Sequence, residues 1–447
     1  MMAGCTNVQT YAGAQVFYWV GFNGIGYILN VFMADTSSLE NRAIAFAFST
    51  TPYIGTTFAG PHIAQRFYEE SSWQWGHGVW AIIMPFACIP FLFVLFKNQN
   101  KAKKIGAIDN TFTPVNRTFG ESVAFWFWEF DVIGIILVMA GFILILLPMS
   151  LANYQRNTWH SATVICMIVF GVLSLVLFGL YERFGAKKSF IPWELLKDRT
   201  ILGACGLSAT LFVSFYCWDA YYSSYLQIVH DLNIQNAGYV YNTYNIGSCF
   251  FGILVAIFIK YTRRFKYLTM CFATPVYIMA TGLMIHFRQP DTPIGYVVMC
   301  QILIAVAGGT FVLCEQLAVM ATATQENVPG VLAFIGLFSS IGGGIGAAIS
   351  GAIWTNTLPK NLQKMLPEDA KPLYLEIYSS LTVAKGYPIG SAERTAINAA
   401  YGATQRLMVI AATCIIATAF VWVGVWKDIK LAKSVDKSKE DRKGTLF

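Results

Sequence analysis

The stretch VIGIILVMAGFILILLPMSLANYQ, residues 132–155, contains no Asp, Glu, Lys or Arg and is almost entirely apolar. About 20 such residues in a helix cross the ~30 Å hydrocarbon core of a bilayer. Every backbone N–H and C=O group in that medium must be hydrogen-bonded within the protein, so a helix is the expected form. This stretch therefore predicts a membrane-spanning helix.

The same pattern recurs along the whole chain. Of its 447 residues, 56% are hydrophobic and 12% are charged, whereas a soluble domain carries roughly 25% charged residues. Eleven uncharged stretches are long enough to span a membrane: 1–34, 43–65, 71–96, 132–155, 157–181, 200–218, 232–259, 267–287, 292–314, 327–359 and 407–426. We predict an all-α polytopic membrane protein with about eleven transmembrane helices.

The basic residues predict the orientation of the chain. If the C-terminus is cytoplasmic, the loops on that side carry 22 of the 31 Lys and Arg residues, as the positive-inside rule requires. The net charge of +7 is then a topology signal, and we expect no nucleic-acid partner. Residues 428–447 are predicted to form a disordered cytoplasmic tail beside anionic lipid.

The N-terminus fits this topology less well. Eleven spans with a cytoplasmic C-terminus place the N-terminus outside, yet residues 1–34 show neither a basic leader region nor a cleavage site. We interpret the chain as a fragment or a truncated gene product.

Motifs of enzymes and metal sites are missing from the sequence. The ten cysteines lie singly in apolar stretches without a C-x-x-C pair, and the five histidines are dispersed. No nucleophile elbow, P-loop or Rossmann glycine run is present. We therefore expect no enzyme, no cofactor and no protein metal site.

Two segments in different halves of the chain resemble one another: LENRAIAFAFSTTPYIGTTFAGP (39–61) and QENVPGVLAFIGLFSSIGGGIGAAISG (325–351). Each begins near a Glu-Asn pair and continues into a span rich in Gly, Ala, Ser and Thr. Small residues allow helices to approach closely in lipid, and repeated halves are typical of transporters. Chance enrichment in glycine is the alternative explanation.

Six runs spread over nearly the whole chain resemble the fungal siderophore–iron transporters of the major facilitator superfamily. They are GFNGIGYILNVFMADTSSLENRAIAFAFST (21–50), TTFAGPHIAQRF (56–67), WDAYYSSYLQ (218–227), GGTFVLCEQLAVMA (308–321), GGGIGAAISGAIWTNTLP (342–359) and GYPIGSAERTAINAAYGATQRLM (386–408).

The resemblance implies a fourteen-helix facilitator whose first three helices are absent from this chain. On that basis we expect the following parts: a remnant of the N-terminal bundle (1–96, family helices four to six), a cytoplasmic linker (97–130), an extra helix pair (131–182), a cytoplasmic loop (183–199) and a C-terminal six-helix bundle (200–427) with a long outer loop (356–403).

The implied activity is proton-coupled import of a ferric siderophore, at the plasma membrane or in endosomal vesicles, by a monomer in membrane lipid. Iron in such a chelate is already bound by oxygen ligands, so the carrier needs a roomy polar and aromatic cavity and no metal site of its own. A drug–proton or glutathione–proton antiporter of the same fold is one alternative. A truncated family member without transport activity is another.

Two intramembrane carboxylates are candidates for proton coupling. Asp219 follows the span 200–218, and Glu315 lies in the inner part of its span beside Gln316. An intramembrane carboxylate usually faces a cavity or a partner group. Asp219 either carries the proton or holds a helix end at the interface, and Glu315 is either a gate or proton site or a structural ion pair.

Candidate substrate-binding residues lie in two places. Gln15 and Asn23, together with Asn30, recur near one face of a predicted helix, where they line a cavity or bond to neighbouring helices. The other group lies toward the outer side and consists of Tyr221, Tyr222, Tyr387, Tyr401 and Arg406. Tyrosine offers flat apolar area and a hydroxyl group, although an interfacial aromatic belt would also place tyrosines there. Asp35, Glu40 and Arg42 follow the first span, where facilitators carry the charges of a cytoplasmic gate.

Overall fold

The computed structural model describes residues 1–37, 41–105, 118–152, 158–185, 197–323 and 327–431. Within these ranges the chain is helical and contains no strand. The prediction of an all-α fold is confirmed.

The helices are α1 (Val8–Thr36), α2 (Arg42–Ser49), α3 (Pro52–Glu70), α4 (Trp73–Lys104), α5 (Phe119–Glu129), α6 (Val132–Leu151), α7 (Ala162–Phe184), α9 (Arg199–Asp219), α10 (Tyr222–Val229), α11 (Ile234–Tyr241), α12 (Thr243–Thr262), α13 (Lys266–Leu268), α14 (Thr274–Phe287), α15 (Ile294–Thr322), α16 (Val328–Met365), α17 (Tyr374–Ser379), α18 (Leu381–Lys385), α19 (Ala392–Ile416) and α20 (Ala419–Val425). A π-helical turn, Thr269–Ala273, joins α13 to α14.

Ten segments of the described chain are long and apolar enough to cross a membrane, each made of one helix or of consecutive helices. The eleventh predicted span, 43–65, is present as the two helices α2 and α3 and is not among these ten. Pro52 begins α3, and because proline has no N–H it favours a helix start over a helix interior.

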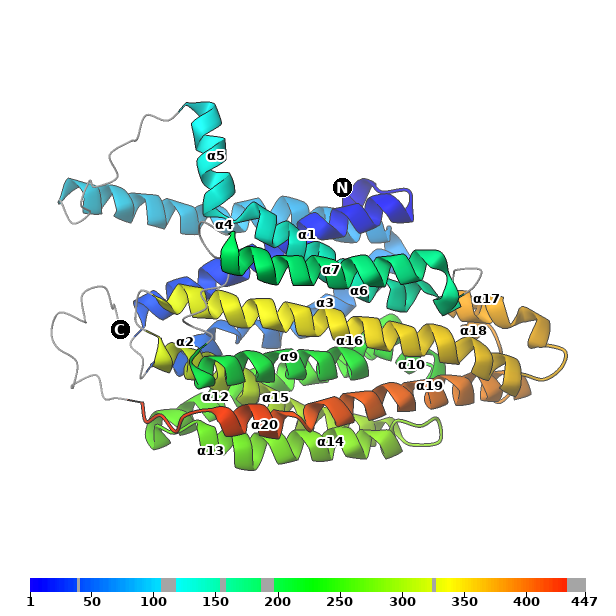
Figure 1. Ribbon diagram of the computed structural model, residues 1–447. Coiled ribbons are helices and arrows are strands. Elements are labelled where there is room, and N and C mark those ends of the chain that lie inside the picture. Colours follow the sequence, from blue (N-terminus) through cyan, green and yellow to red (C-terminus); the bar gives the residue numbers. More distant parts are fainter. Residues whose placement is uncertain (38–40, 106–117, 153–157, 186–196, 324–326, 432–447) are drawn as a thin grey trace.

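Most of the long helices lie side by side in one bundle (Figure 1). At one end lie α10, α17 and α18, and we call this the loop end. At the opposite end lie α2, α13 and the last described residues of the chain, and we call this the tail end. Helix α5 projects away from the bundle (Figure 1).

The core of the molecule lies in its C-terminal half. Of the 18 most apolar consecutive residues, 72% are buried in α9–α10 and 67% in α15. None is buried in the corresponding stretches of α1 and α4. Helix α16 packs along α9, and a Cβ atom added to Gly342 would lie 2.3 Å from the carbonyl oxygen of Ala209. Glycine is therefore required for this close contact between two backbones.

The two halves of the chain contact one another at both ends of the bundle. Toward the loop end, α3 packs on α11, and the ring of Pro61 lies over Gly238. Toward the tail end, α2 packs on α12 and α15. Helices α6 and α7 pack on each other, and α6 also packs on α16.

Candidate functional site

The membrane-spanning segment Arg199–Val229 is broken near its loop end. Helix α9 ends at Asp219, Ala220 is not helical (ψ 136°), and α10 begins at Tyr222. Tyr221 between them adopts the left-handed conformation (φ 57°, ψ 11°), which costs a residue with a side chain roughly 1–2 kcal/mol. Broken helices of this kind form substrate and ion sites in many transporters.

Two polar side chains compensate for the break. The last carbonyls of a helix have no N–H partner within it, and in a membrane they need another donor. Arg288 Nη1 donates to the carbonyl of Trp218 at 2.5 Å, and Gln405 Nε2 reaches the carbonyl of Ala220 at 3.5 Å. Arg288, after α14, and Gln405, on α19, therefore satisfy backbone carbonyls at the break.

Arg288 is completely buried at the end of α14. Its guanidinium carbon lies 4.0 Å from the ring centre of Tyr222 and 5.4 Å from that of Tyr225, which stabilises the cation through the ring faces. Nε and Nη2 have no hydrogen-bond partner among the described residues, and neither do the hydroxyls of the two tyrosines.

Asp219 directly follows Trp218, whose carbonyl accepts the hydrogen bond from Arg288, and it is 9% exposed. Its Oδ2 accepts a hydrogen bond of 2.7 Å from the Tyr241 hydroxyl on α11. The charges of Asp219 and Arg288 also interact. The result is a buried carboxylate with a phenol partner and a neighbouring permanent cation.

Three aromatic rings from three elements form a wall at the loop end. Tyr221 stacks on Trp354 of α16, with ring centres 4.2 Å apart and an interplanar angle of 4°. Tyr401 of α19 meets the same indole edge-on at 5.4 Å. Tyr221 remains 39% exposed. The structure thus brings together the predicted residues Asp219, Tyr221, Tyr222 and Tyr401.

Tyr387 packs against the apolar cluster that contains Tyr222 and Tyr401, and Arg406 makes no described contact with that group. The Tyr387 carbonyl accepts a hydrogen bond of 3.3 Å from Arg394, which is 2% exposed. Arg394 also binds the carbonyls of Ala384, Lys385 and Ile228, and so fixes the segment after α17 against the end of α10. Arg406 is exposed on α19 and makes no hydrogen bond or ion pair with other described residues.

A cavity of about 970 Å³ lies between α1 and α16, with contributions from α3 and α4. The polar residues Asn23 and Asn30 line it, together with Ser340 and aromatic side chains such as Tyr27 and Trp80. Of the predicted polar stripe Gln15, Asn23 and Asn30, only the two asparagines line this cavity. Gln15 instead donates a hydrogen bond of 2.7 Å to the Tyr11 hydroxyl.

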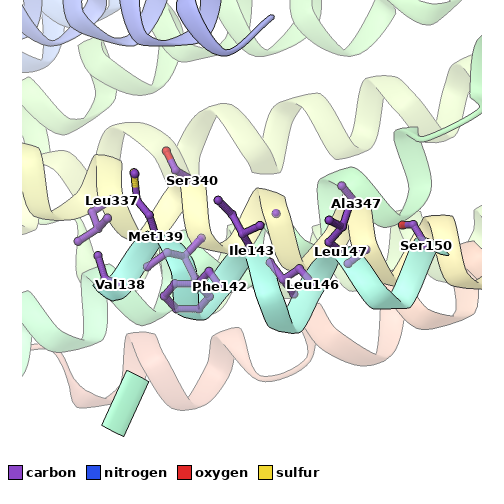
Figure 2. A pocket seen from close by; sticks show the side chains of 13 residues that line it. Val138, Met139, Phe142, Ile143, Leu146, Leu147, Ser150, Leu337, Ser340 and Ala347 are labelled. Carbon is purple, nitrogen blue, oxygen red and sulfur yellow. The ribbon is translucent and has the colours of Figure 1, made fainter. Parts of the chain in front are cut away.

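A second, smaller cavity of about 510 Å³ lies between α6 and α16 (Figure 2). Its walls are almost wholly apolar, and Ser150 and Ser340 are the labelled polar side chains that border it. Leu337 and Ser340 line both cavities, so the two spaces adjoin at α16.

Glu315 is buried at 1% exposure on α15. Its Oε1 accepts a hydrogen bond of 3.0 Å from Ser208 of α9, and the Ser208 hydroxyl lies 2.6 Å from that of Ser339 on α16. The carboxylate thus links three helices, and its Oε2 has no partner among the described residues.

At the predicted cytoplasmic gate, Arg42 is 4% exposed and binds backbone groups. Its Nε donates to the carbonyls of Ala34 at 3.1 Å and Ser37 at 3.3 Å, at the end of α1. Asp35 is exposed, and its charge acts on Arg42. Glu40 lies outside the described residues.

Sequence reasoning missed Arg288, Tyr241, Trp354 and Gln405. One signal for Arg288 was available, because it is the only basic residue between Lys266 and Lys360 and directly follows an apolar span. The other three resemble ordinary membrane-helix residues, and only their contacts with residues 218–221 distinguish them.

Comparison with known proteins identifies the family. Residues 2–420 match the family described as "Fungal trichothecene efflux pump (TRI12)". The chain is 50% identical over 431 residues to "MFS siderochrome iron transporter 1" of Ajellomyces capsulatus, covering 96% of this chain and 73% of the relative. It is 45% identical to "Siderochrome iron transporter 2" of Aspergillus fumigatus (98% and 72% covered) and 41% identical to "Siderophore iron transporter 1" of Schizosaccharomyces pombe (92% and 66% covered).

The chain belongs to the siderochrome iron transporter family of the major facilitator superfamily. The family predicted from the sequence is confirmed. Its relatives carry the names of transporters, in agreement with the prediction that the chain is not an enzyme. Together with ten candidate spans, this membership makes the chain an integral membrane protein.

Proposed function

We propose that this siderochrome transporter family member imports ferric siderophores across a fungal membrane, driven by protons. The names of its relatives support the cargo. The observation that carries the coupling proposal is Asp219, a buried carboxylate at a break in a membrane-spanning segment. A carboxylate held in that setting can alternate between a protonated and an ionised form as the carrier changes conformation.

The cargo is proposed to enter between the two halves of the chain. A cavity of about 970 Å³ is at the upper end of the range typical for small-molecule sites. Asn23 would contact the chelate there, with Gln15 about two turns earlier on α1. The aromatic wall of Tyr221, Trp354 and Tyr401, backed by the buried Tyr222, would receive the chelate at the loop end. Tyr387 and Arg406 are proposed to contribute from nearby in the sequence.

Rocking of the two halves about this central space would carry the chelate across. Asp219 is the proposed proton carrier, and Glu315 is a second candidate because it joins three helices of the C-terminal bundle. Asp35, Glu40 and Arg42 would close the tail end. We place this end and the C-terminus on the cytoplasmic side, and we propose that the protein acts as a monomer in the plasma membrane or in endosomal vesicles.

Export is the second candidate function, because the matched family is described as an efflux pump. In that case the same proton site would drive a toxic compound outward. Resistance of cells to such compounds, without growth on a siderophore as sole iron source, would favour export.

Uptake of radio-iron tests the proposal directly. Yeast without its own siderophore carriers would express the chain and receive radio-iron as several ferric siderophores, with the Ajellomyces capsulatus relative as positive control. We expect saturable uptake of at least one chelate, lost when the proton gradient is dissipated. Absence of uptake despite normal amounts of protein in the membrane would contradict import by this chain.

A C-terminal tag tests the orientation in the same cells. We expect the tag to resist protease added to intact cells and to be digested after permeabilisation. Digestion in intact cells would reverse the proposed topology.

A further inference from the structure

Arg288 is a buried cation without an ion pair among the described residues. It is 0% exposed, and its one hydrogen bond to oxygen is to the carbonyl of Trp218. Arginine remains protonated in proteins, and an isolated buried charge is very costly. Something near Arg288 must balance its charge.

Asp219 is the carboxylate next to this contact along the chain, and its charge acts on Arg288. It directly follows Trp218, to which Arg288 is bonded, so this contact brings the guanidinium to the end of α9 that carries the carboxylate. Two N–H-bearing nitrogens of Arg288, Nε and Nη2, are not engaged by other described groups. The two charges are thus buried together at the break between α9 and α10.

We infer that Arg288 is the positioning residue for Asp219: it holds the end of α9 in place and balances the Asp219 carboxylate when that group is ionised. This inference rests on the proposed role of Asp219 in proton coupling. Arg288 then belongs to the coupling site because it positions Asp219, and it does not itself bind the cargo.

The surroundings of Arg288 allow Asp219 to lose its charge without expelling the arginine. When Asp219 is protonated, the Trp218 carbonyl and the ring faces of Tyr222 and Tyr225 still hold the cation. The other titratable groups whose interactions reach Asp219 are the phenols of Tyr216, Tyr222, Tyr241, Tyr244 and Tyr277. None of these is a second cation, so Arg288 alone supplies the balancing charge within the described chain.

A double-mutant cycle on the purified full chain tests the pairing. Asp219→Asn, Arg288→Gln and the double variant would be compared by thermal unfolding in detergent. Removing one of two buried opposite charges leaves the other uncompensated, so each single substitution should lower the unfolding midpoint by roughly 5 °C. The double variant should lose no more than the worse single variant, because both charges are gone.

The exposed pair Arg66–Glu70 provides the matched control. Its atoms lie 3.2 Å apart, but the two side chains are 62% and 63% exposed. Arg66→Gln, Glu70→Gln and their double variant should each stay close to the wild-type midpoint. If the losses of Asp219→Asn and Arg288→Gln simply add, the inference is overturned. This measurement does not depend on transport, so it separates failure of the pairing from failure of the proposed function.

Uptake distinguishes a coupling role from a purely structural one. Arg288→Lys keeps the positive charge but loses the planar guanidinium, whereas Arg288→Gln loses the charge. Among variants present in equal amounts in the membrane, Arg288→Lys should retain more gradient-driven uptake than Arg288→Gln. Equal uptake by the two would overturn the coupling role of Arg288.

Discussion

Asp219 combines burial with a single hydrogen bond from Tyr241. We predict that Asp219→Asn abolishes uptake driven by the proton gradient while leaving protein in the membrane, because the amide still accepts the Tyr241 hydrogen bond but cannot exchange a proton. Radio-iron uptake with and without an uncoupler measures this. Asp291→Asn, at an exposed acid three residues after Arg288, is the control and should transport normally. Coupled uptake by Asp219→Asn would remove Asp219 from the mechanism.

The tyrosines of the loop end differ in exposure, so they need different substitutions. Tyr221 is 39% exposed and stacks on Trp354, whereas Tyr401 is 2% exposed. Tyr221→Ala and Tyr387→Ala should raise the apparent KM for the chelate more than they lower the maximal rate. Tyr401→Ala would open a cavity in the core, so Tyr401→Phe, which removes only the hydroxyl group, is its proper test. An unchanged KM in all three variants would assign these rings to the interface belt.

At the scale of elements, Arg394 connects four backbone carbonyls around α18 and α10. Arg394→Ala would leave these buried acceptors without a donor and should loosen the segment between α17 and α19. We expect faster proteolysis there than in the wild type. Lys371→Ala, which removes an exposed pair with Glu368 in the same loop, should leave the cleavage rate unchanged. Equal cleavage of Arg394→Ala and wild type would show that the hydrogen bonds of Arg394 are not needed to hold this segment.

At the tail end, Asp198 caps α9 by accepting from Thr200 N–H, and it forms an ion pair with Lys427 after α20. Partial burial raises the pKa of the Asp198 carboxyl, but the hydrogen bonds from Lys427 and Thr200 outweigh burial and hold it below its ordinary value of 3.8. A depressed pKa in the folded state adds stability above the ordinary value, and this stability is lost as pH falls through the folded value.

Asp198→Ala should therefore lower the unfolding midpoint near neutral pH, by the loss of about 1 kcal/mol of capping energy, and should lose less further stability than wild type on acidification. Thermal unfolding in detergent at about pH 7 and about pH 3 measures both. High salt should weaken the contribution of the ion pair, because the pair is partly exposed. An identical acid-induced loss in both proteins would contradict a role for Asp198.

The helices could be predicted from uncharged stretches because burial in lipid imposes length and composition on each span. The break at residues 220–221 could not, since the left-handed Tyr221 is stabilised by Trp354, which is far away in sequence. Asp219 was identifiable as an acid at the end of a span, but Arg288 depended on knowing that the ends of α9 and α14 meet. The division of residues 43–65 into α2 and α3 likewise reflects a local proline effect that the hydropathy pattern hides.

At the scale of the whole molecule, transport by rocking requires the two halves to separate and meet again. The ring of Pro61 would lie 2.7 Å from a Cβ atom placed on Gly238, closer than such atoms can approach. Gly238→Ala should therefore hinder closure at the loop end and reduce the maximal uptake rate, with normal amounts of protein in the membrane. Gly282→Ala, where a Cβ atom meets no neighbour within 4 Å, is the control. Full uptake by Gly238→Ala would exclude this contact from the transport cycle.

Helix α16 has 38 residues, which corresponds to about 57 Å at 1.5 Å per residue. This length is almost twice the ~30 Å thickness of the hydrocarbon core. The bilayer with its headgroups is ~45 Å thick, so about 12 Å of an untilted α16 extends beyond it, and α17 and α18 follow this helix in the chain. The loop end then projects from the bilayer surface, where a soluble inhibitor or an antibody could bind it without entering the membrane.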